Sequence, residues 1–295
     1  MMDQAATLRR LVAERRPPTA DRRTRVVAVT SGKGGVGKTS LATNLGIVLA
    51  QRGARVILLD GDLGLANVHV LLGLTPSRTL QDVLAGAAAL SEVIIPGPGG
   101  VMVLPGASGL EHLAELPVSQ RQALLAALAG LDGQADFLLV DTAAGIGETV
   151  SALVLAADEV LLVTTPEPPA LTDAYALMKV VARRMAAPRF RLVVNQARTA
   201  DEASSIGRGL ATIARRFLGA EVELVGWLPV DPVVGEAARR QVPFVLAYPG
   251  APATARVRLL GEQFGGWAAP VATVGVRPFL RRLLAGRTVS VGVGR

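Results

Sequence analysis

The sequence contains no cysteine, only two histidines and 3% aromatic residues among its 295 residues. Without cysteine the chain cannot build disulfides, thiolate metal sites or cysteine-ligated iron–sulfur clusters. The two histidines, His69 and His112, stand far apart in the sequence, which disfavours a metal site made of histidines. No run approaches the roughly 18 uninterrupted apolar residues of a membrane-spanning helix, and the polar start gives no sign of a secretory signal. These absences together predict a soluble cytoplasmic protein.

Half of the residues are apolar, which excludes a mostly disordered chain and is enough to bury a substantial core. Short apolar runs that we interpret as buried strands occupy residues 25–30, 56–59, 101–104, 137–140, 160–164, 191–194 and 222–225. Helical patterns lie between most of them, at residues 39–52, 118–129, 171–186 and 201–218. Apolar strands that alternate with helices predict an α/β fold, with a mostly parallel central sheet covered by helices on both faces.

The formal net charge of +7 is concentrated near the two ends of the chain. Residues 1–25 hold seven arginines against three acidic residues, and residues 277–295 hold five arginines and no acidic residue. The stretch between them carries a slight excess of negative charge. A near-neutral body argues against nucleic acid as the partner, whereas basic tails favour an anionic surface or a protein partner. Tails that only aid solubility are the plainer alternative.

A glycine-rich segment after the first predicted strand matches the phosphate-binding pattern G-x-x-x-x-G-K-[ST] and opens a predicted helix. Its residues are Gly32, Lys33, Gly34, Gly35, Val36, Gly37, Lys38 and Thr39, and Ser40 follows. The glycines let successive N–H groups turn toward phosphate oxygens, and the start of the helix adds partial positive charge. We expect Lys38 to bridge the β- and γ-phosphates and Thr39 to ligate Mg²⁺.

Two further predicted strands end in carboxylates. Asp60 and Asp62 follow the second strand, and Asp141 follows the fourth. Because Mg²⁺ keeps several waters and binds few protein oxygens directly, such carboxylates beside a phosphate loop suit a hydrated magnesium ion. Each aspartate taken alone is also compatible with a helix cap. The joint pattern favours the metal.

With Lys33 the loop has the form K-G-G-x-G-K-[ST], and residues 60–67 have the form D-x-D-x-G-x-x-N. The chain thereby resembles the deviant Walker A ATPases of the MinD/ParA family. The resemblance implies that Lys33 reaches across a dimer interface to the nucleotide of the partner subunit. There a cation would neutralise charge that develops during phosphoryl transfer. A solvated loop lysine is the alternative.

The same resemblance assigns parts to the carboxylates and to a nearby glycine. It implies that Asp60 and Asp141 hold metal-bound waters, while Asp62 positions or deprotonates the attacking water. The backbone N–H of Gly145 would approach the γ-phosphate and sense its loss. Asn67 would join the contacts with the nucleotide on the dimer side.

The resemblance places recognition of the base after the sixth and seventh predicted strands. Asn195 ends the sixth strand, and Pro229 and Asp231 belong to a P-x-D segment after the seventh. In the family such an asparagine and such a segment flank adenine. The chain has no N-K-x-D segment, which reads guanine in related GTPases. ATP and ADP are therefore favoured over guanine nucleotides.

Residues 3–9 read D-Q-A-A-T-L-R, which resembles a D-Q-A-x-x-L-R motif of the flagellar number and placement regulators within the family (the FlhG, FleN or YlxH type). Segments 62–68, 105–110 and 164–175 resemble the same subfamily. The motif implies that Asp3, Gln4, Leu8 and Arg9 engage and stimulate the SRP-type GTPase FlhF. Flagellar C-ring or transcription-regulator proteins are further implied partners. An ordinary charged terminal helix is the alternative.

Residues 278–287 have an amphipathic helical pattern with a basic bias. Its apolar face carries Phe279, Leu280, Leu283 and Leu284. Burying these four side chains in lipid would contribute at most about 6–12 kcal/mol, most of which partial depth and ordering would offset. One copy should bind an anionic membrane marginally, whereas two copies in an ATP-bound dimer should bind it firmly. A helix packed on its own domain is the alternative.

The sequence is thus divided into a partner-binding helix and linker (1–24), an ATPase domain (25–248) and a C-terminal extension (249–295). We expect a slow, dimer-dependent ATPase that regulates flagellar number or placement and binds the inner face of the cell membrane reversibly. The alternatives are a ParA-like DNA-partition ATPase, a MinD-like septum-positioning ATPase, and a non-catalytic regulator of a flagellar transcription factor.

Overall fold

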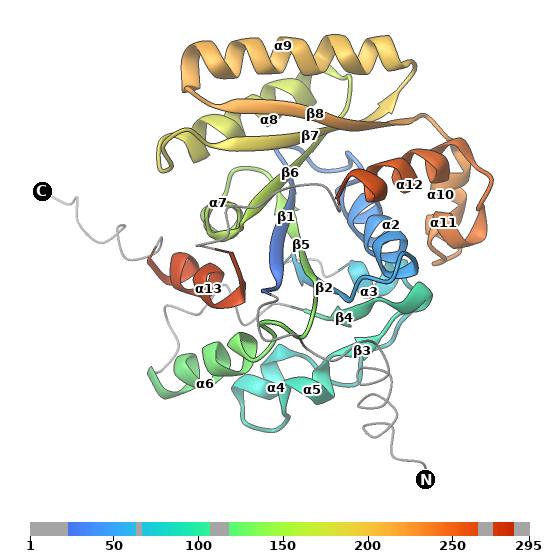
Figure 1. Cartoon of the computed structure of the whole chain (residues 1–295). Coiled ribbons are helices and arrows are strands. Elements are labelled where there is room, and N and C mark those ends of the chain that lie inside the picture. The colour runs from blue at the N-terminus through green and yellow to red at the C-terminus, as the bar shows by residue number, and fades with distance from the viewer. Residues whose placement is uncertain (1–22, 63–66, 107–117, 265–273, 286–295) are drawn as a thin grey trace, which may run out of the picture.

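The computed structural model describes residues 23–62, 67–106, 118–264 and 274–285. Within these residues eight strands form one sheet in the order β3-β4-β2-β5-β1-β6-β7-β8 (Figure 1). The strands are β1 (Arg25–Ser31), β2 (Val56–Gly61), β3 (Ile95–Pro96), β4 (Met102–Leu104), β5 (Phe137–Ala144), β6 (Glu159–Thr164), β7 (Arg189–Ala197) and β8 (Glu221–Pro229). All neighbours pair in parallel except β3, which is antiparallel to β4. The expected mostly parallel α/β sheet is confirmed.

Helices cover both faces of this sheet (Figure 1). They are α2 (Lys38–Gln51), α3 (Val68–Leu71), α4 (Leu80–Leu84), α5 (Leu90–Val93), α6 (Val118–Ala129), α7 (Glu148–Ala156), α8 (Pro168–Ala182), α9 (Ala200–Leu218), α10 (Pro232–Arg239), α11 (Phe244–Ala247), α12 (Pro252–Phe264) and α13 (Val276–Ala285), with a 3₁₀ turn at Pro98–Gly100. One core joins the sheet to α4–α9 and α13, and the other joins it mainly to α2, α3, α10, α11 and α12.

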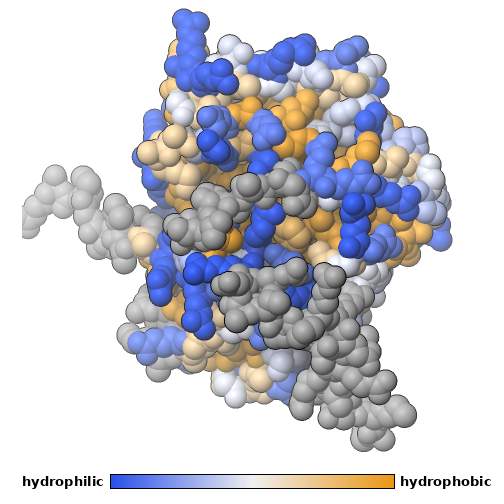
Figure 2. Space-filling model, in the orientation of Figure 1, coloured by the Kyte–Doolittle hydropathy of each residue, from blue (hydrophilic) through white to orange (hydrophobic). Residues whose placement is uncertain are grey.

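Alternate residues of the central strands point into the two cores. On β1, Val26 and Ala28 face the α7 side, while Val27 and Val29 face the α2 side, and all four are fully buried. A strand that is buried on both faces needs apolar residues throughout, which is why these runs could be identified from the sequence. Outer helices are amphipathic instead. Figure 2 shows hydrophilic side chains gathered over α9, whose buried face carries small and apolar residues.

Several short elements were not predicted. The helices α3, α4, α5 and α11 have only four or five residues each, which is too few to establish a helical period. The helix α7 is apolar along most of its length and lacks the contrast between a polar and an apolar face. The strand β3 has two residues. The helix expected within residues 3–16 lies outside the described residues.

The helix expected near residues 278–287 is present as α13, but its apolar face points inward. It packs against α6, α7 and β1 of its own chain. The buried side chains are Phe279, Leu280 and Leu283, together with Val276, and Leu284 is half-buried. Arg282 also holds the helix to this surface, donating from Nε to the Ala156 carbonyl (2.7 Å) and from Nη2 to Asp158 Oδ1 (2.6 Å). In this state the face that was expected to meet a membrane is therefore part of the core.

Two carboxylates hold the entry to α13 beside the entry to β1. Asp158 Oδ2 accepts hydrogen bonds from the backbone N–H groups of Val26 (2.9 Å) and Gly275 (3.2 Å). Asp132 Oδ1 accepts from those of Thr24 (3.2 Å) and Val276 (3.4 Å). The chain before β1 and the chain before α13 consequently meet at the amino ends of the strands.

Candidate functional site

The glycine-rich loop connects β1 to α2 at the carboxyl end of the central strand. Gly37 precedes the helix with φ 87°, a left-handed conformation that glycine adopts without strain. Gly32 is required for a different reason, since a Cβ atom there would lie 2.1 Å from the backbone of Asp173 in α8. The loop is thus pressed against α8 at its start and turned sharply into α2 at its end.

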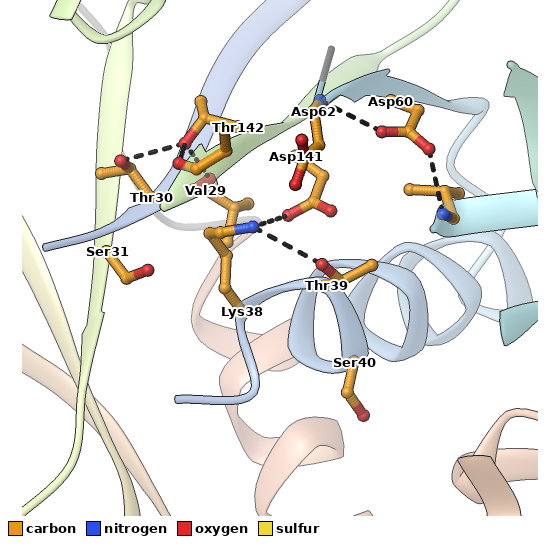
Figure 3. A network of polar contacts seen from close by, with 12 residues as sticks. Val29, Thr30, Ser31, Lys38, Thr39, Ser40, Asp60, Asp62, Asp141 and Thr142 are labelled. Carbon is orange, nitrogen blue, oxygen red and sulfur yellow. Dashed lines mark hydrogen bonds and ion pairs between the residues drawn. The ribbon is translucent and has the colours of Figure 1, made fainter. Parts of the chain in front are cut away.

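Lys38 and Asp141 form a buried ion pair at the centre of the site (Figure 3). Lys38 Nζ lies 3.0 Å from Asp141 Oδ1 and 3.5 Å from the Thr39 hydroxyl. Both charged side chains are almost fully buried, at 7% and 2% exposure. Burial raises the pKa of Asp141, and the ammonium of Lys38 opposes that rise. The three residues that the sequence assigned to phosphate and metal binding therefore lie together.

The donors around Asp141 fit a hydrated magnesium ion. Asp141 Oδ2 is buried and has no hydrogen-bond partner among the described residues, although a buried carboxylate oxygen normally has one. The Thr39 hydroxyl lies close by, 3.5 Å from the Lys38 ammonium that pairs with Asp141. Within the described ranges no group of three or more acidic or histidine side chains is arranged to hold a metal through protein ligands alone. A metal bound here would complete its shell with water and phosphate oxygens, as Mg²⁺ does.

Asp60 lies next to Asp141, with which it is paired in register between β2 and β5, and it is fully buried. Its Oδ1 accepts from the Asp62 N–H (3.2 Å) and its Oδ2 from the Val68 N–H (3.0 Å). Burial raises the pKa of Asp60 to about 6, and the charge of Asp141 adds to that rise. Asp60 was expected to hold a metal-bound water, but in the structure both of its oxygens serve backbone donors. Asp62 is half-buried beside this cluster (Figure 3).

The end of β5 is tied to β1 by contacts that the sequence did not suggest. The Thr142 hydroxyl lies 3.0 Å from the Thr30 hydroxyl and 3.2 Å from the Val29 carbonyl (Figure 3). Gly145 has φ 102°, and its N–H donates to the Ser31 carbonyl at 2.9 Å. The N–H that was expected to meet a γ-phosphate therefore donates to the last residue of β1, directly before the phosphate loop.

Lys33 makes its ion pair with Glu167. Its Nζ lies 2.9 Å from Glu167 Oε2, and the two side chains are 38% and 62% exposed. Glu167 occupies the N-cap position of α8 without capping the helix through its side chain. Within one chain, the lysine near the start of the motif, Lys33, thus pairs with a surface carboxylate.

The residues expected around adenine have structural contacts of their own, and Asn195 among them adjoins the loop. Asn195 Nδ2 donates to the Val36 carbonyl at 2.7 Å, which attaches the end of β7 to the phosphate loop. Asp231 accepts from the N–H groups of Val233 (3.2 Å) and Ala253 (3.1 Å), so it caps both α10 and α12. Pro229 ends β8. Contact of these residues with a base stays a prediction.

The remaining assignments fall partly outside the described residues. Asp3, Gln4, Leu8 and Arg9 are not described, so binding of a partner through them stays a prediction. Asn67 is exposed just before α3. No helix in the described part of the chain is long and apolar enough to cross a membrane.

Residues 27–244 match the family model described as the CobQ/CobB/MinD/ParA nucleotide binding domain. The chain is 43% identical over 260 residues to the antiactivator FleN of Pseudomonas aeruginosa, covering 88% of this chain and 93% of FleN. It is 40% identical over 157 residues to the flagellum site-determining protein YlxH of Helicobacter pylori, covering 53% of each. The septum site-determining protein MinD of Pyrococcus horikoshii, solved with Mg-ADP, superposes with a TM-score of 0.65 at 28% identity, covering 82% of this chain and 96% of that one.

Proposed function

The chain belongs to the CobQ/CobB/MinD/ParA family of nucleotide-binding proteins, and we propose that it is an ATP-hydrolysing dimerisation switch that regulates flagellar number or placement. The observation that carries the enzymatic part is the buried Lys38–Asp141 pair, with an unpartnered carboxylate oxygen beside Thr39. The flagellar part is supported by the likeness to FleN, which extends over most of both chains.

Nucleotide binding would rearrange the buried ion pair. Phosphate oxygens in the loop would attract Lys38 more strongly than one carboxylate does, because they carry several negative charges, and the start of α2 would help to hold them there. Asp141 would then be released from Lys38 and would share a hydrated Mg²⁺ with Thr39. When bound, the metal supplies positive charge to the phosphate oxygens. Asn195 holds the loop from the side where the base would lie.

Hydrolysis would depend on Asp62 and on a second subunit. Asp62 would orient the attacking water and accept its proton, while the new bond forms between the water oxygen and the γ-phosphorus. The bond from that phosphorus to the β–γ bridging oxygen breaks, and the oxygen leaves with ADP. Lys33 would leave Glu167 and reach the nucleotide of the partner subunit, so turnover would be slow until two subunits pair.

Membrane and partner binding complete the proposal. Reversible attachment to an anionic membrane would require α13 to leave its site on α6 and α7, since its apolar face is covered there. The helix α7 begins directly after Gly145 and Gly147, so a change at the phosphate site has a direct route to α13. Residues 3–9 would engage the SRP-type GTPase FlhF.

The test compares Lys38→Ala with Asp62→Ala by size-exclusion chromatography with light scattering. Lys38→Ala should lose ATP binding, because no other buried cation faces the phosphates among the described side chains. Asp62→Ala should bind ATP, stop hydrolysing it and accumulate as a dimer. Lys33→Ala is the matched control, which should bind ATP and remain monomeric. An Asp62→Ala protein that stays monomeric in saturating ATP would refute the dimerisation switch.

A further inference from the structure

Asp60 and Asp141 are neighbouring carboxylates at the ends of adjacent strands, yet their surroundings differ. We infer that Asp60 is a positioning residue, whose carboxylate fixes the backbone of Asp62 and the start of α3, and that Asp141 alone of the two carboxylates faces the metal. The inference deepens the proposed ATPase function and rests on it for the role of Asp62. It differs from what the resemblance implies, which is that both carboxylates hold metal-bound waters.

The first step is the use of the oxygens. Asp60 is fully buried, and each of its oxygens accepts a hydrogen bond from a backbone N–H, Oδ1 from Asp62 and Oδ2 from Val68. Asp141 is buried to the same degree, but its Oδ2 has no partner among the described residues. Since buried polar atoms are nearly always paired, Asp141 Oδ2 is the oxygen of the two carboxylates that is available to the metal or its waters.

The second step is direction. In Figure 3 Asp60 lies beside Asp62 and the start of α3, to which its two hydrogen bonds run, whereas Asp141 faces Lys38 directly. Asp62 lies two residues from Asp60 in the chain, and Val68 lies eight residues away. One carboxylate therefore holds two separate points of the backbone.

The third step is the consequence for the reaction. A group that orients an attacking water must be held to a fraction of an ångström. Asp62 is only half-buried, and its backbone N–H donates to Asp60. Loss of the Asp60 carboxylate should therefore lower the hydrolysis rate through Asp62, with little change in the affinity for the metal.

The test compares Asp60→Asn with Asp141→Asn. Asparagine keeps one acceptor oxygen and presents an NH₂ group to the other backbone N–H, so one of the two contacts is lost. Two quantities are measured for each variant: the affinity for Mg²⁺, by titrating the metal into protein with fluorescent ADP, and the amide exchange of Asp62 and Val68. Hydrolysis is followed separately, and circular dichroism verifies that each variant is folded.

Asp60→Asn should keep its Mg²⁺ affinity within about twofold, exchange faster at whichever of the Asp62 and Val68 amides loses its acceptor, and hydrolyse ATP at least about tenfold more slowly. Asp141→Asn should lose at least about tenfold in Mg²⁺ affinity, as expected for a group on the metal side, with slow exchange retained at those two amides. An Asp60→Asn protein that loses as much Mg²⁺ affinity as Asp141→Asn, with unchanged exchange, overturns the inference.

A measurement on the unaltered protein covers the case in which a variant fails to fold. If Asp60 turned to the metal, adding Mg²⁺ and ADP would free the N–H groups of Asp62 and Val68 and speed their exchange. Unchanged or slower exchange supports the positioning role, and faster exchange at both amides overturns it. Exchange without nucleotide tests the contacts of Asp60 even if the protein hydrolyses no ATP, so failure of the proposed function and failure of this inference are distinguishable.

Discussion

Replacement of Arg282 by alanine tests how α13 is held on its own domain. The arginine makes hydrogen bonds of 2.7 Å to the Ala156 carbonyl and 2.6 Å to Asp158. Hydrogen bonds that involve a charged group contribute about 1.5–3 kcal/mol each. The Arg282 side chain is 32% exposed, so water would replace part of this interaction in the variant. We expect a net loss of about 2 kcal/mol, which corresponds to roughly a thirtyfold larger population of undocked α13.

Two assays measure this change. Thermal unfolding should show a midpoint lower by about 4–8 °C, as expected for a loss of this size in a domain of more than 150 residues. Sedimentation with anionic liposomes should show increased binding in the absence of nucleotide, because the apolar face of α13 is uncovered more often. Arg281→Ala is the matched control, since it removes the same charge from an exposed position of the same helix. If Arg282→Ala and Arg281→Ala give equal midpoints and equal liposome binding, Arg282 does not hold α13.

Three further predictions concern the site. Because burial raises the pKa of Asp60 from 3.8 to about 6, the folded chain binds this proton more tightly than the unfolded chain. The stability that Asp60 contributes is therefore complete below about pH 4 and is lost as the pH rises through 6, a change of about 3 kcal/mol. Urea unfolding at several pH values should show this change in the wild type and not in Asp60→Asn. Parallel curves of stability against pH for the two proteins would contradict the prediction. Gly32→Ala should lower the free energy of unfolding by about 3 kcal/mol, since its Cβ would overlap the Asp173 backbone. The control Gly209→Ala, which has open space around it in α9, should stabilise the protein by up to about 1 kcal/mol. Equal unfolding midpoints for the two variants would refute the predicted overlap at Gly32. Glu167→Gln should leave stability nearly unchanged, because the Lys33 pair is exposed, and should tighten ATP-dependent dimerisation by up to about fivefold in light scattering; weaker dimerisation would show that Glu167 assists Lys33 in the dimer.

The sequence predicted most of the sheet and the centre of the site, for identifiable reasons. Strands buried on both faces need continuous apolar runs, as in β1 and β5. Parallel strands bring their carboxyl ends to one edge, so Lys38, Thr39 and Asp141 had to meet there. The motif spacing then indicated which of these groups would serve phosphate and which would serve metal.

Contacts between distant parts of the chain could not be predicted in this way. Asp231 caps α12 through Ala253, which lies 22 residues away, and no spacing rule links the two. The amphipathic pattern of α13 predicts an apolar stripe, but a membrane and the surface of α7 would satisfy that stripe equally. The contact of Arg282 with Asp158, which helps to decide between the two, joins residues 124 positions apart and follows from no sequence pattern.

The shared attachment of β1 and α13 at Asp132 and Asp158 has a geometric consequence. The chain enters β1 at the amino end of the sheet, whereas the glycine-rich loop lies at the carboxyl end, roughly 20 Å away along the seven residues of β1. A molecule attached through its N-terminal tail would therefore present the phosphate-binding end of the sheet away from the point of attachment. Attachment through this tail and pairing with a second copy at the glycine-rich loop would therefore use opposite ends of the sheet, and neither would obstruct the other.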